Sequence, residues 1–297
     1  MPSISTPAPT SPESKPTTSS VGGSRGKADL HLHTRFSDGT DTPERVVDLA
    51  KQVGLSVIAI TDHDNTEALA IAEPLARERR LELIPGIEMS ASTEGLEVHL
   101  LGFFIDVHHV PFMQHLSEQQ ARRVARVHDI VARLQRIGVS ITPEEVLLMA
   151  GQGTVGRPHV ARVLLQHGYV SSLSEAFSRY LGPERPGFVP GSPIAPAQII
   201  RLIRDAGGIP VLAHPVYLKR DELIEEFMRQ GLAGLEVYHS SHTPDLVRHY
   251  ERIAARLQLL KTGGSDYHGD SKEGVPVGAA AIPLELIEGL KRWKSNI

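Results

Sequence analysis

The chain has 297 residues, 40% of them hydrophobic, which is enough to bury the core of one large α/β domain or of a barrel with an insertion. The net charge of −4, without a dense run of Lys and Arg, gives no sign of membrane attraction or nucleic-acid binding, although a local basic groove remains compatible with it. The absence of cysteine excludes disulfides, thiolate nucleophiles and cysteine-bound zinc, so histidines and carboxylates are the only strong metal ligands.

Residues 1–27 are rich in Ser, Thr, Pro and Gly and contain no apolar run that resembles a signal peptide, so we predict a disordered tail. No later segment reaches the roughly 18 uninterrupted apolar residues that a membrane span needs. From these absences we expect a cytoplasmic enzyme with no membrane contact and no obligate protein partner.

The first expected strand is the stretch Asp29–Thr34, with the sequence DLHLHT. Successive side chains of a strand alternate between its faces, so His31 and His33 share one face while Leu30 and Leu32 share the other. Two imidazoles about 7 Å apart on one face can hold the same metal ion.

Strands and helices then alternate up to about residue 104. We expect helices over 43–53 and 66–80, started by Thr42-Pro43 and capped by Thr66, and strands over 56–60, 81–87 and 97–101. Potential ligands follow or occupy these strands: Asp62, His63, Asp64, Glu88 and His99. Ligands at successive strand ends are typical of a parallel barrel with its active site at that end.

The alternation stops between residues 105 and 196, where we predict a helical insertion. Apolar residues at helical spacing (Val124, Val127, Ile130, Val131 and Leu134) indicate a helix over 113–137. A segment rich in Pro and Gly, residues 182–191, returns the chain to the barrel. The barrel therefore comprises residues 28–104 and 197–297, and the insertion is expected to act as a lid.

After the insertion the barrel pattern resumes. We expect helices over 196–206, 244–257 and 284–293, and strands over 209–213, 232–237, 259–262 and 279–282. His214 follows the first of these strands, and Asp266 and His268 follow the third. Closing the strands into a barrel brings all these side chains to one mouth.

Asp38, in the loop after the first strand, adds a further carboxylate. The nine strongest candidates exceed what one ion can use, so we predict two or three divalent ions bridged by a carboxylate: His31, His33, Asp38, His63, Glu88, His99, His214, Asp266 and His268. The mixture of imidazoles and carboxylates suits Mn²⁺, Fe²⁺ or Zn²⁺, and such clusters suit displacement at phosphorus.

The segments DLHLHT, TDHD, PGIE, VHLLG, AHP and GSDYHG, in this order and spacing, resemble the PHP (polymerase and histidinol phosphatase) superfamily. The resemblance covers residues 28–282 and implies an α/β fold, a distorted (β/α)7 TIM-like barrel with a two- or three-metal site. The insertion and the sequence GRPH at 156–159 resemble the stand-alone phosphoesterases that act on nucleoside 3′,5′-bisphosphates or as 5′-to-3′ exoribonucleases.

By this resemblance, His31, His33, Glu88 and Asp266 hold one ion. Glu88 bridges to a second ion, held by His99 and His214, and Asp38, His63 and His268 hold a third. A hydroxide generated at the metals attacks the phosphorus. Mn²⁺ is the expected metal, with Fe²⁺, Zn²⁺ or Mg²⁺ as alternatives.

Four residues are candidates for substrate binding: Arg157, His159, His239 and His242. Arg157 lies beside Pro158 at an expected helix start, where free amides attract phosphate, and the other reading of this arginine is a cap or salt bridge. For His239 and His242 the alternative is a surface loop. Asp62 and Glu236 are expected to orient ligand histidines, although Asp62 and Asp64 could instead be solvated helix caps.

We therefore predict a metal-dependent phosphatase or phosphodiesterase acting on small nucleotides such as 3′,5′-bisphosphates, with exonuclease action on short RNA 5′ ends as an extension. Alternatives are a histidinol-phosphate phosphatase and a non-catalytic metal-binding PHP module. A barrel resembling the amidohydrolases would commonly place a Lys between its metals, and Glu88 stands at that position here.

Overall fold

The computed structural model describes residues 26–191, 193–272 and 274–296, so most of the expected tail lies outside the described residues. One sheet of eight strands has the order β7-β6-β5-β4-β3-β2-β1-β8. The strands are β1 (Lys27–Leu32), β2 (Leu55–Ile60), β3 (Glu82–Thr93), β4 (Leu96–Phe103), β5 (Ile209–Leu212), β6 (Gly234–His239), β7 (Leu260–Gly264) and β8 (Ile282–Pro283). The expected α/β barrel is thereby confirmed.

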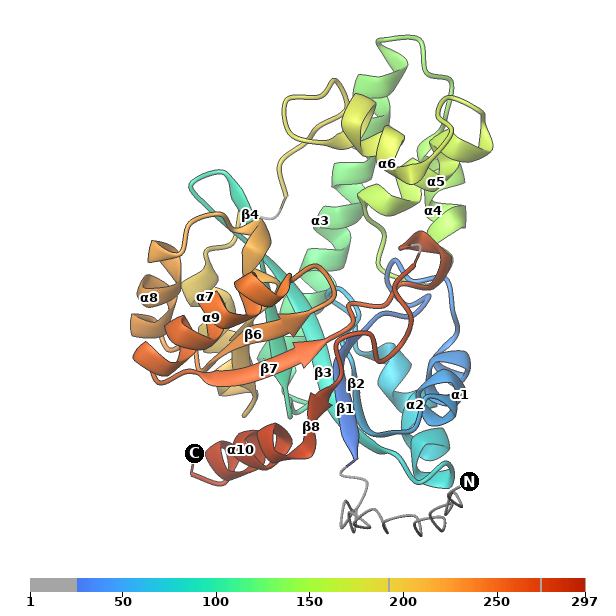
Figure 1. The fold of residues 1–297 in the computed structure, drawn as a ribbon. Helices are drawn as coiled ribbons and strands as arrows, with labels where there is room; N and C mark the ends of the chain where they lie inside the picture. The colour runs from blue at the N-terminus through green and yellow to red at the C-terminus, as the bar shows by residue number, and fades with distance from the viewer. Residues whose placement is uncertain (1–25, 192, 273, 297) are drawn as a thin grey trace, which may run out of the picture.

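The barrel is almost closed where β1 meets the end of β7 (Figure 1). The amide of Asp266 donates to the carbonyl of His31 at 2.9 Å, which draws two segments far apart in sequence together. A Cβ added at Gly264 would lie 2.4 Å from the backbone nitrogen of His31, so only glycine permits this approach. The contact places Asp266 beside the histidines of the first strand.

The sheet is not parallel throughout, which corrects the expected pattern. β3 pairs with β4 and β4 pairs with β5 in antiparallel orientation, whereas β1, β2 and β3 run parallel, as do β5, β6 and β7. Glu94 and Gly95 both have positive φ, 49° and 80°, and form the tight turn that joins β3 to β4. Glu88 therefore lies within a long strand and His99 within its antiparallel neighbour, and neither stands at a strand end.

The barrel helices pack outside the sheet, and the five that the sequence predicted begin and end within two residues of their expected bounds. The barrel helices are α1 (Pro43–Gln52), α2 (Glu67–Glu78), α7 (Pro196–Asp205), α8 (Glu222–Arg229), α9 (Pro244–Arg256) and α10 (Leu284–Lys294). The expected cap is confirmed at Thr42, whose side chain accepts from the amide of Arg45 at 3.3 Å. Thr66 occupies the expected cap position of α2, but its side chain makes no capping hydrogen bond, and Asn65 instead accepts from the amide of Glu67 at 2.8 Å. Helix α8 was not expected.

Between β4 and β5 the chain forms α3 (Val110–Gln135), α4 (Pro143–Ala150), α5 (Arg157–Gln166), α6 (Leu173–Ala176) and η1 (Phe177–Leu181), which we call the helical insertion. It stands above the barrel mouth in Figure 1. Phe112 and Leu116 of α3 pack in a barrel core, while Val127 and Ile130 belong to the insertion's own core. The long helix thus connects the two cores. Val124, expected to be in the stripe, is 36% exposed.

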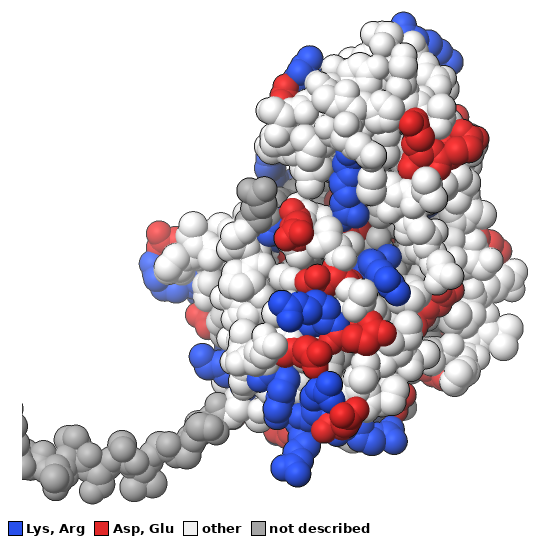
Figure 2. Space-filling view, turned by 90° about the vertical axis from the view of Figure 1, so that its right-hand side faces the viewer, with Lys and Arg blue, Asp and Glu red and all other residues white. Residues whose placement is uncertain are grey.

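Acidic and basic side chains are interspersed over the barrel part of the face shown in Figure 2, without a broad patch of one sign. Among the described residues, no helix has the length and apolar character that crossing a bilayer requires.

Candidate metal centre and active site

A buried group of four side chains lies at the end of β1. It comprises His31, His33, Glu88 and Asp266, which we call the deep set. Oε2 of Glu88 lies 3.1 Å from Nε2 of both His31 and His33. Oδ1 of Asp266 lies 3.3 Å and 3.4 Å from the same two nitrogens. The alternation of β1 turns both rings to one side, with centroids 5.1 Å apart, so both present nitrogen to the same carboxylates.

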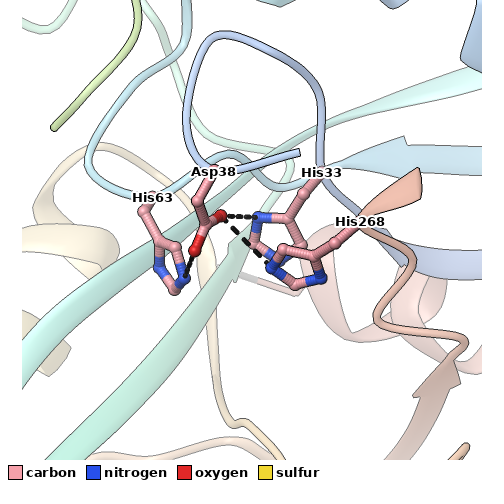
Figure 3. Close-up of side chains that lie close together, drawn as sticks. All are labelled: His33, Asp38, His63 and His268. Carbon is pink, nitrogen blue, oxygen red and sulfur yellow. Dashed lines mark ion pairs between the residues drawn. The ribbon is translucent and has the colours of Figure 1, made fainter. Parts of the chain in front are cut away.

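A second group, the outer set, comprises Asp38, His63 and His268, carried by the loops after β1, β2 and β7. Oδ1 of Asp38 is 3.2 Å from Nε2 of His268, and its Oδ2 is 3.7 Å from Nε2 of His63 (Figure 3). His33 contacts this set as well, since its Nδ1 is 3.8 Å from Oδ1 of Asp38. One ligand atom from each of the four side chains lies within 4.8 Å of every other, a spacing that one cation can use.

Glu88 also contacts two further imidazoles, those of His99 and His214. Its Oε1 lies 3.0 Å from Nδ1 of His99 and 2.9 Å from Nε2 of His214. Its Oε2, which faces the deep set, is also 3.4 Å from Nδ1 of His63. A carboxylate with its two oxygens facing different imidazole groups has the geometry needed to bridge two ions. The structure therefore brings together all nine side chains that the sequence singled out.

The chemistry of the cluster fits divalent cations. Three buried atoms of the cluster have no hydrogen-bond partner among the described residues: Nε2 of His33, Oδ1 of Asp38 and Nδ1 of His63. Buried polar atoms without a partner are costly, and all three lie at the contacts within the cluster. Cations between these donors would satisfy them, and imidazoles mixed with carboxylates suit Mn²⁺, Fe²⁺ or Zn²⁺.

The ionisation of these groups is strongly coupled. Burial alone would raise the pKa of the carboxyls of Asp38, Glu88 and Asp266, but the charges of the neighbouring imidazoles hold it well below its usual range. Burial opposes protonation of His33, yet the nearby carboxylates of Asp266 and Glu88 raise its pKa to about 9. Burial dominates at His63 and lowers its pKa to about 3. Metal binding would therefore displace protons from part of the cluster.

Two carboxylates that the sequence suggested as supports are buried. Oε1 of Glu236 is 2.9 Å from Nδ1 of His31, and its Oε2 accepts from the amide of His214 at 2.7 Å, so one side chain fixes two predicted ligands. Asp62 accepts from the amide and hydroxyl of Thr34, at 2.7 Å and 2.6 Å, and from the hydroxyl of Ser37 at 2.6 Å. Asp62 thus anchors the loop that carries Asp38, and the alternative of a solvated cap is wrong.

Asp64 is also buried rather than solvated. Its carboxylate lies 2.8 Å from a guanidinium nitrogen of Arg123 and accepts from the amide of Ser90 at 3.2 Å. Arg123 belongs to α3, so this ion pair joins the helical insertion to the loop after β2. The sequence offered no indication of this partner.

The two histidines beyond β6 are placed differently from each other. His239 is buried, with Nε2 3.2 Å from Oδ2 of Asp266, and the surface-loop alternative is wrong for it. His242 is half-buried, with Nδ1 2.8 Å from the carbonyl of Val237 and its ring 4.9 Å from that of Tyr250. Contact with a substrate remains a prediction for both.

Lys272 is a site residue that the sequence did not reveal. Its Nζ lies 2.7 Å from Oδ2 of Asp266, the oxygen that also faces His239. The only local signal is its place six residues after Asp266, in the same loop.

Three arginines of the helical insertion reach the edge of the cluster. Together with Asp38, His63, Glu97 and His99, they line a cavity of about 90 Å³, which we call the arginine cavity: Arg123, Arg126 and Arg157. A second cleft of about 840 Å³, lined by mostly apolar residues such as Leu96, Phe188 and Tyr217, shares Arg157, Glu97 and His99 with it. A polar cavity at the predicted ligands thus adjoins a larger cleft.

His159 does not line the arginine cavity, although it lies on α5 together with Arg157. It is buried, and its Nδ1 accepts from the amide of Gly156 at 3.1 Å, which caps the start of α5. Burial lowers its pKa to about 4. The structure gives His159 a capping role, and its role in substrate binding stays a prediction.

Comparison with known proteins places this geometry in a family. The model of the PHP domain matches residues 29–175. The chain is 36% identical over 249 residues to a 5′-3′ exoribonuclease of Escherichia coli, covering 81% of this chain and 84% of that protein. It is 32% identical over 256 residues to a 3′,5′-nucleoside bisphosphate phosphatase of Chromobacterium violaceum, covering 84% and 90%.

A solved structure from Bifidobacterium adolescentis, assigned as a metal-dependent phosphoesterase, superposes with a TM-score of 0.83 at 33% identity, covering 90% of this chain and 96% of that one. The barrel and the cluster of imidazoles and carboxylates agree with this likeness. The chain belongs to the PHP-domain family and is a metal-dependent phosphoesterase.

Proposed function

We propose that the protein hydrolyses phosphate esters of small nucleotides that carry a second phosphate, such as nucleoside 3′,5′-bisphosphates, and that it also acts on the 5′ ends of short RNA. The observation that carries this proposal is the arginine cavity, because Arg123, Arg126 and Arg157 lie beside predicted metal ligands. Guanidinium groups beside the predicted metal ligands can hold a second phosphate of the substrate while the first one is attacked.

The nine residues of the cluster would hold two or three ions, with Mn²⁺ as the expected metal. His31, His33, Glu88 and Asp266 would hold one ion, His99 and His214 a second together with Glu88, and the outer set a third. Bound ions of this kind polarise the phosphoryl group and lower the pKa of coordinated water.

The chain's own residues supply position and charge. Glu236 and Asp62 keep His31 and the Asp38 loop in place, so the predicted ligands are oriented before a substrate arrives. Arg157 and Arg126 would orient the second phosphate, and the helical insertion that carries them would act as a lid that limits access of water. The cytoplasmic location expected from the sequence stays a prediction.

A substrate panel tests the proposal. Purified protein loaded with Mn²⁺ is assayed against adenosine 3′,5′-bisphosphate, adenosine monophosphates, 5′-phosphorylated RNA and histidinol phosphate. We expect the highest kcat/KM for the bisphosphate or the RNA. A preference for histidinol phosphate, or no hydrolysis of any nucleotide by fully loaded protein, would contradict it.

The contribution of the arginine cavity is tested by Arg157→Gln. We expect KM for the bisphosphate to rise by about tenfold or more, since a charge-assisted contact is lost. The KM for a nucleoside monophosphate should change little. As a control, Arg77→Gln removes an arginine whose partner is Glu73 on the exposed face of α2. Equal effects of Arg157→Gln on both substrates would argue against a second phosphate in this cavity.

A further inference from the structure

Glu97 is an acidic residue that lines the arginine cavity beside Arg126 and Arg157. It lies on β4, two residues before His99, and its side chain is 30% exposed. It is paired with Arg157 through Oε2, and its Oε1 lies 3.8 Å from Arg126. The resemblance to the family assigned no role to this residue.

The two arginines are also held by groups other than Glu97. Arg126 donates to the carbonyl of Val189 at 2.8 Å and 3.1 Å, and the guanidinium of Arg157 lies 5.9 Å from the ring centroid of Phe177. Their positions therefore do not depend on the carboxylate alone. If Glu97 moved aside, both guanidinium groups would remain at the cavity with unused donors.

The charge balance of the cavity makes Glu97 a competitor for an incoming phosphate. Arg123 is neutralised by Asp64, at 2.8 Å, and Arg126 and Arg157 share the carboxylate of Glu97. The other acidic residue that lines the cavity, Asp38, faces His63 and His268 instead. A phosphate needs the same donors that Glu97 occupies, because guanidinium offers the same fork to either group. Glu97 also lines both the arginine cavity and the larger cleft, so it lies where the two meet.

We propose that Glu97 is an internal counter-anion that competes with the substrate's second phosphate for Arg126 and Arg157 and so limits how tightly that phosphate is held. The proposal rests on the proposed function in taking the second phosphate as its ligand. Its consequence is that a phosphate bound in the arginine cavity can leave again, because the carboxylate returns to the same donors.

Anion binding without metal tests this proposal apart from catalysis. Metal-stripped wild-type protein and Glu97→Gln are titrated with inorganic sulfate in a calorimeter. We expect sulfate to bind Glu97→Gln about tenfold or more tightly than wild type, the factor expected when a charged competitor is removed. The double variant Glu97→Gln/Arg126→Gln should lose this gain, which assigns it to the arginine cavity rather than to protonated histidines.

Two further measurements separate the proposal from other roles of Glu97. Its Oε1 is 3.7 Å from Nε2 of His99, so a mere positioning role would lower Mn²⁺ affinity and leave sulfate binding unchanged. As a control, Glu82→Gln breaks a comparable pair with Lys291 at 2.9 Å on the barrel exterior. This variant should bind both sulfate and Mn²⁺ as tightly as wild type does. Unchanged sulfate affinity in Glu97→Gln would overturn the proposal, whether or not the loaded enzyme hydrolyses nucleotides.

Steady-state kinetics of the metal-loaded protein test the same competition through KM. In Glu97→Gln we expect KM for adenosine 3′,5′-bisphosphate to fall by about tenfold, while KM for a nucleoside monophosphate changes little. A rise in KM for both substrates would show instead that Glu97 contacts the nucleoside, and would contradict competition with phosphate.

Discussion

The deep and outer sets differ in the elements that carry them. The deep set comes from β1, from β3 and from the residues just after β1 and β7, and the side chains of His31, His33 and Glu88 are at most 1% exposed, while that of Asp266 is 11% exposed. Asp38, His63 and His268 lie on loops, and their side chains are 11–13% exposed. Sheet pairing fixes the first set, whereas the second depends on contacts between loops, so we expect its ion to bind more weakly and to exchange faster.

Those loop contacts are specific. The amide of Thr40 donates to the carbonyl of His268 at 3.2 Å, and the hydroxyl of Ser271 donates to the carbonyl of Asp38 at 3.1 Å. Arg162 of α5 bonds to both Ser271 and Asp38, which ties the helical insertion to the outer set. The outer site is therefore tied to the helical insertion by the hydrogen bonds of Arg162.

Removal of Glu88 should break the distinction between the sets, because its carboxylate faces His31, His33, His99 and His214. Glu88→Ala should lower kcat/KM by about a thousandfold or more, since charge stabilisation worth several kcal/mol is lost. Circular dichroism should show a folded protein, and metal analysis should show fewer bound ions. Activity within tenfold of wild type would refute a central role for this carboxylate.

Asp38→Asn should sharpen the distinction, because it weakens the outer set alone. We expect turnover to fall by about a hundredfold, with one fewer ion bound, while the deep site keeps its affinity. Asp48→Asn is a matched control, because Asp48 pairs with Arg79 at 3.0 Å on the exterior. Equal loss of affinity at all sites would show that the sets are not separate.

The sequence predicted the parts of the site that have local signals and missed those that depend on turns and tertiary contacts. His31 and His33 could be placed on one face by strand alternation, and the order of the motifs indicated the remaining ligand candidates. The antiparallel hairpin of β3 and β4 was not predicted, because its strand direction depends on a two-residue turn at Glu94-Gly95 within an apparently continuous pattern of alternating elements. The pairing of Asp64 with Arg123, 59 residues apart, is a tertiary contact with no local signal.

Helix α8 was missed although Leu223, Ile224 and Phe227 have helical spacing and are buried. The signal was present there and could have been used. Lys272 shows the opposite case, because nothing in a single sequence distinguishes a lysine that reaches Asp266 from one that faces solvent.

Glu236→Gln tests the support of the deep set. The amide can still accept from the amide of His214, but the charge that faces His31 is lost. We expect metal affinity to fall by about 10–100-fold, as is typical for partners of metal-binding histidines. Glu251→Gln, which alters the acceptor of the Tyr238 hydroxyl at 2.7 Å, should leave metal affinity unchanged. An unchanged metal affinity in Glu236→Gln would show that this carboxylate does not support the predicted ligands.

The last expected effect concerns the stability of the insertion at low pH rather than metal binding or turnover. His159 has a folded-state pKa of about 4 against 6.5 for an unperturbed histidine, so its stabilising contribution is present above pH 6.5 and is lost as the pH falls toward 4. The loss amounts to about 3 kcal/mol. His159→Gln keeps an acceptor for the amide of Gly156 and does not titrate, so its unfolding free energy should fall less between pH 7 and 4.5. Parallel pH profiles of the two proteins would contradict this.

The central claim, a deep and an outer metal site on one barrel, is tested most directly by titrating the metal-stripped protein with Mn²⁺ in a calorimeter. We predict at least two classes of site, with Asp38→Asn abolishing the weaker class and leaving the tighter one intact. A single class of site that Asp38→Asn does not alter would contradict the account.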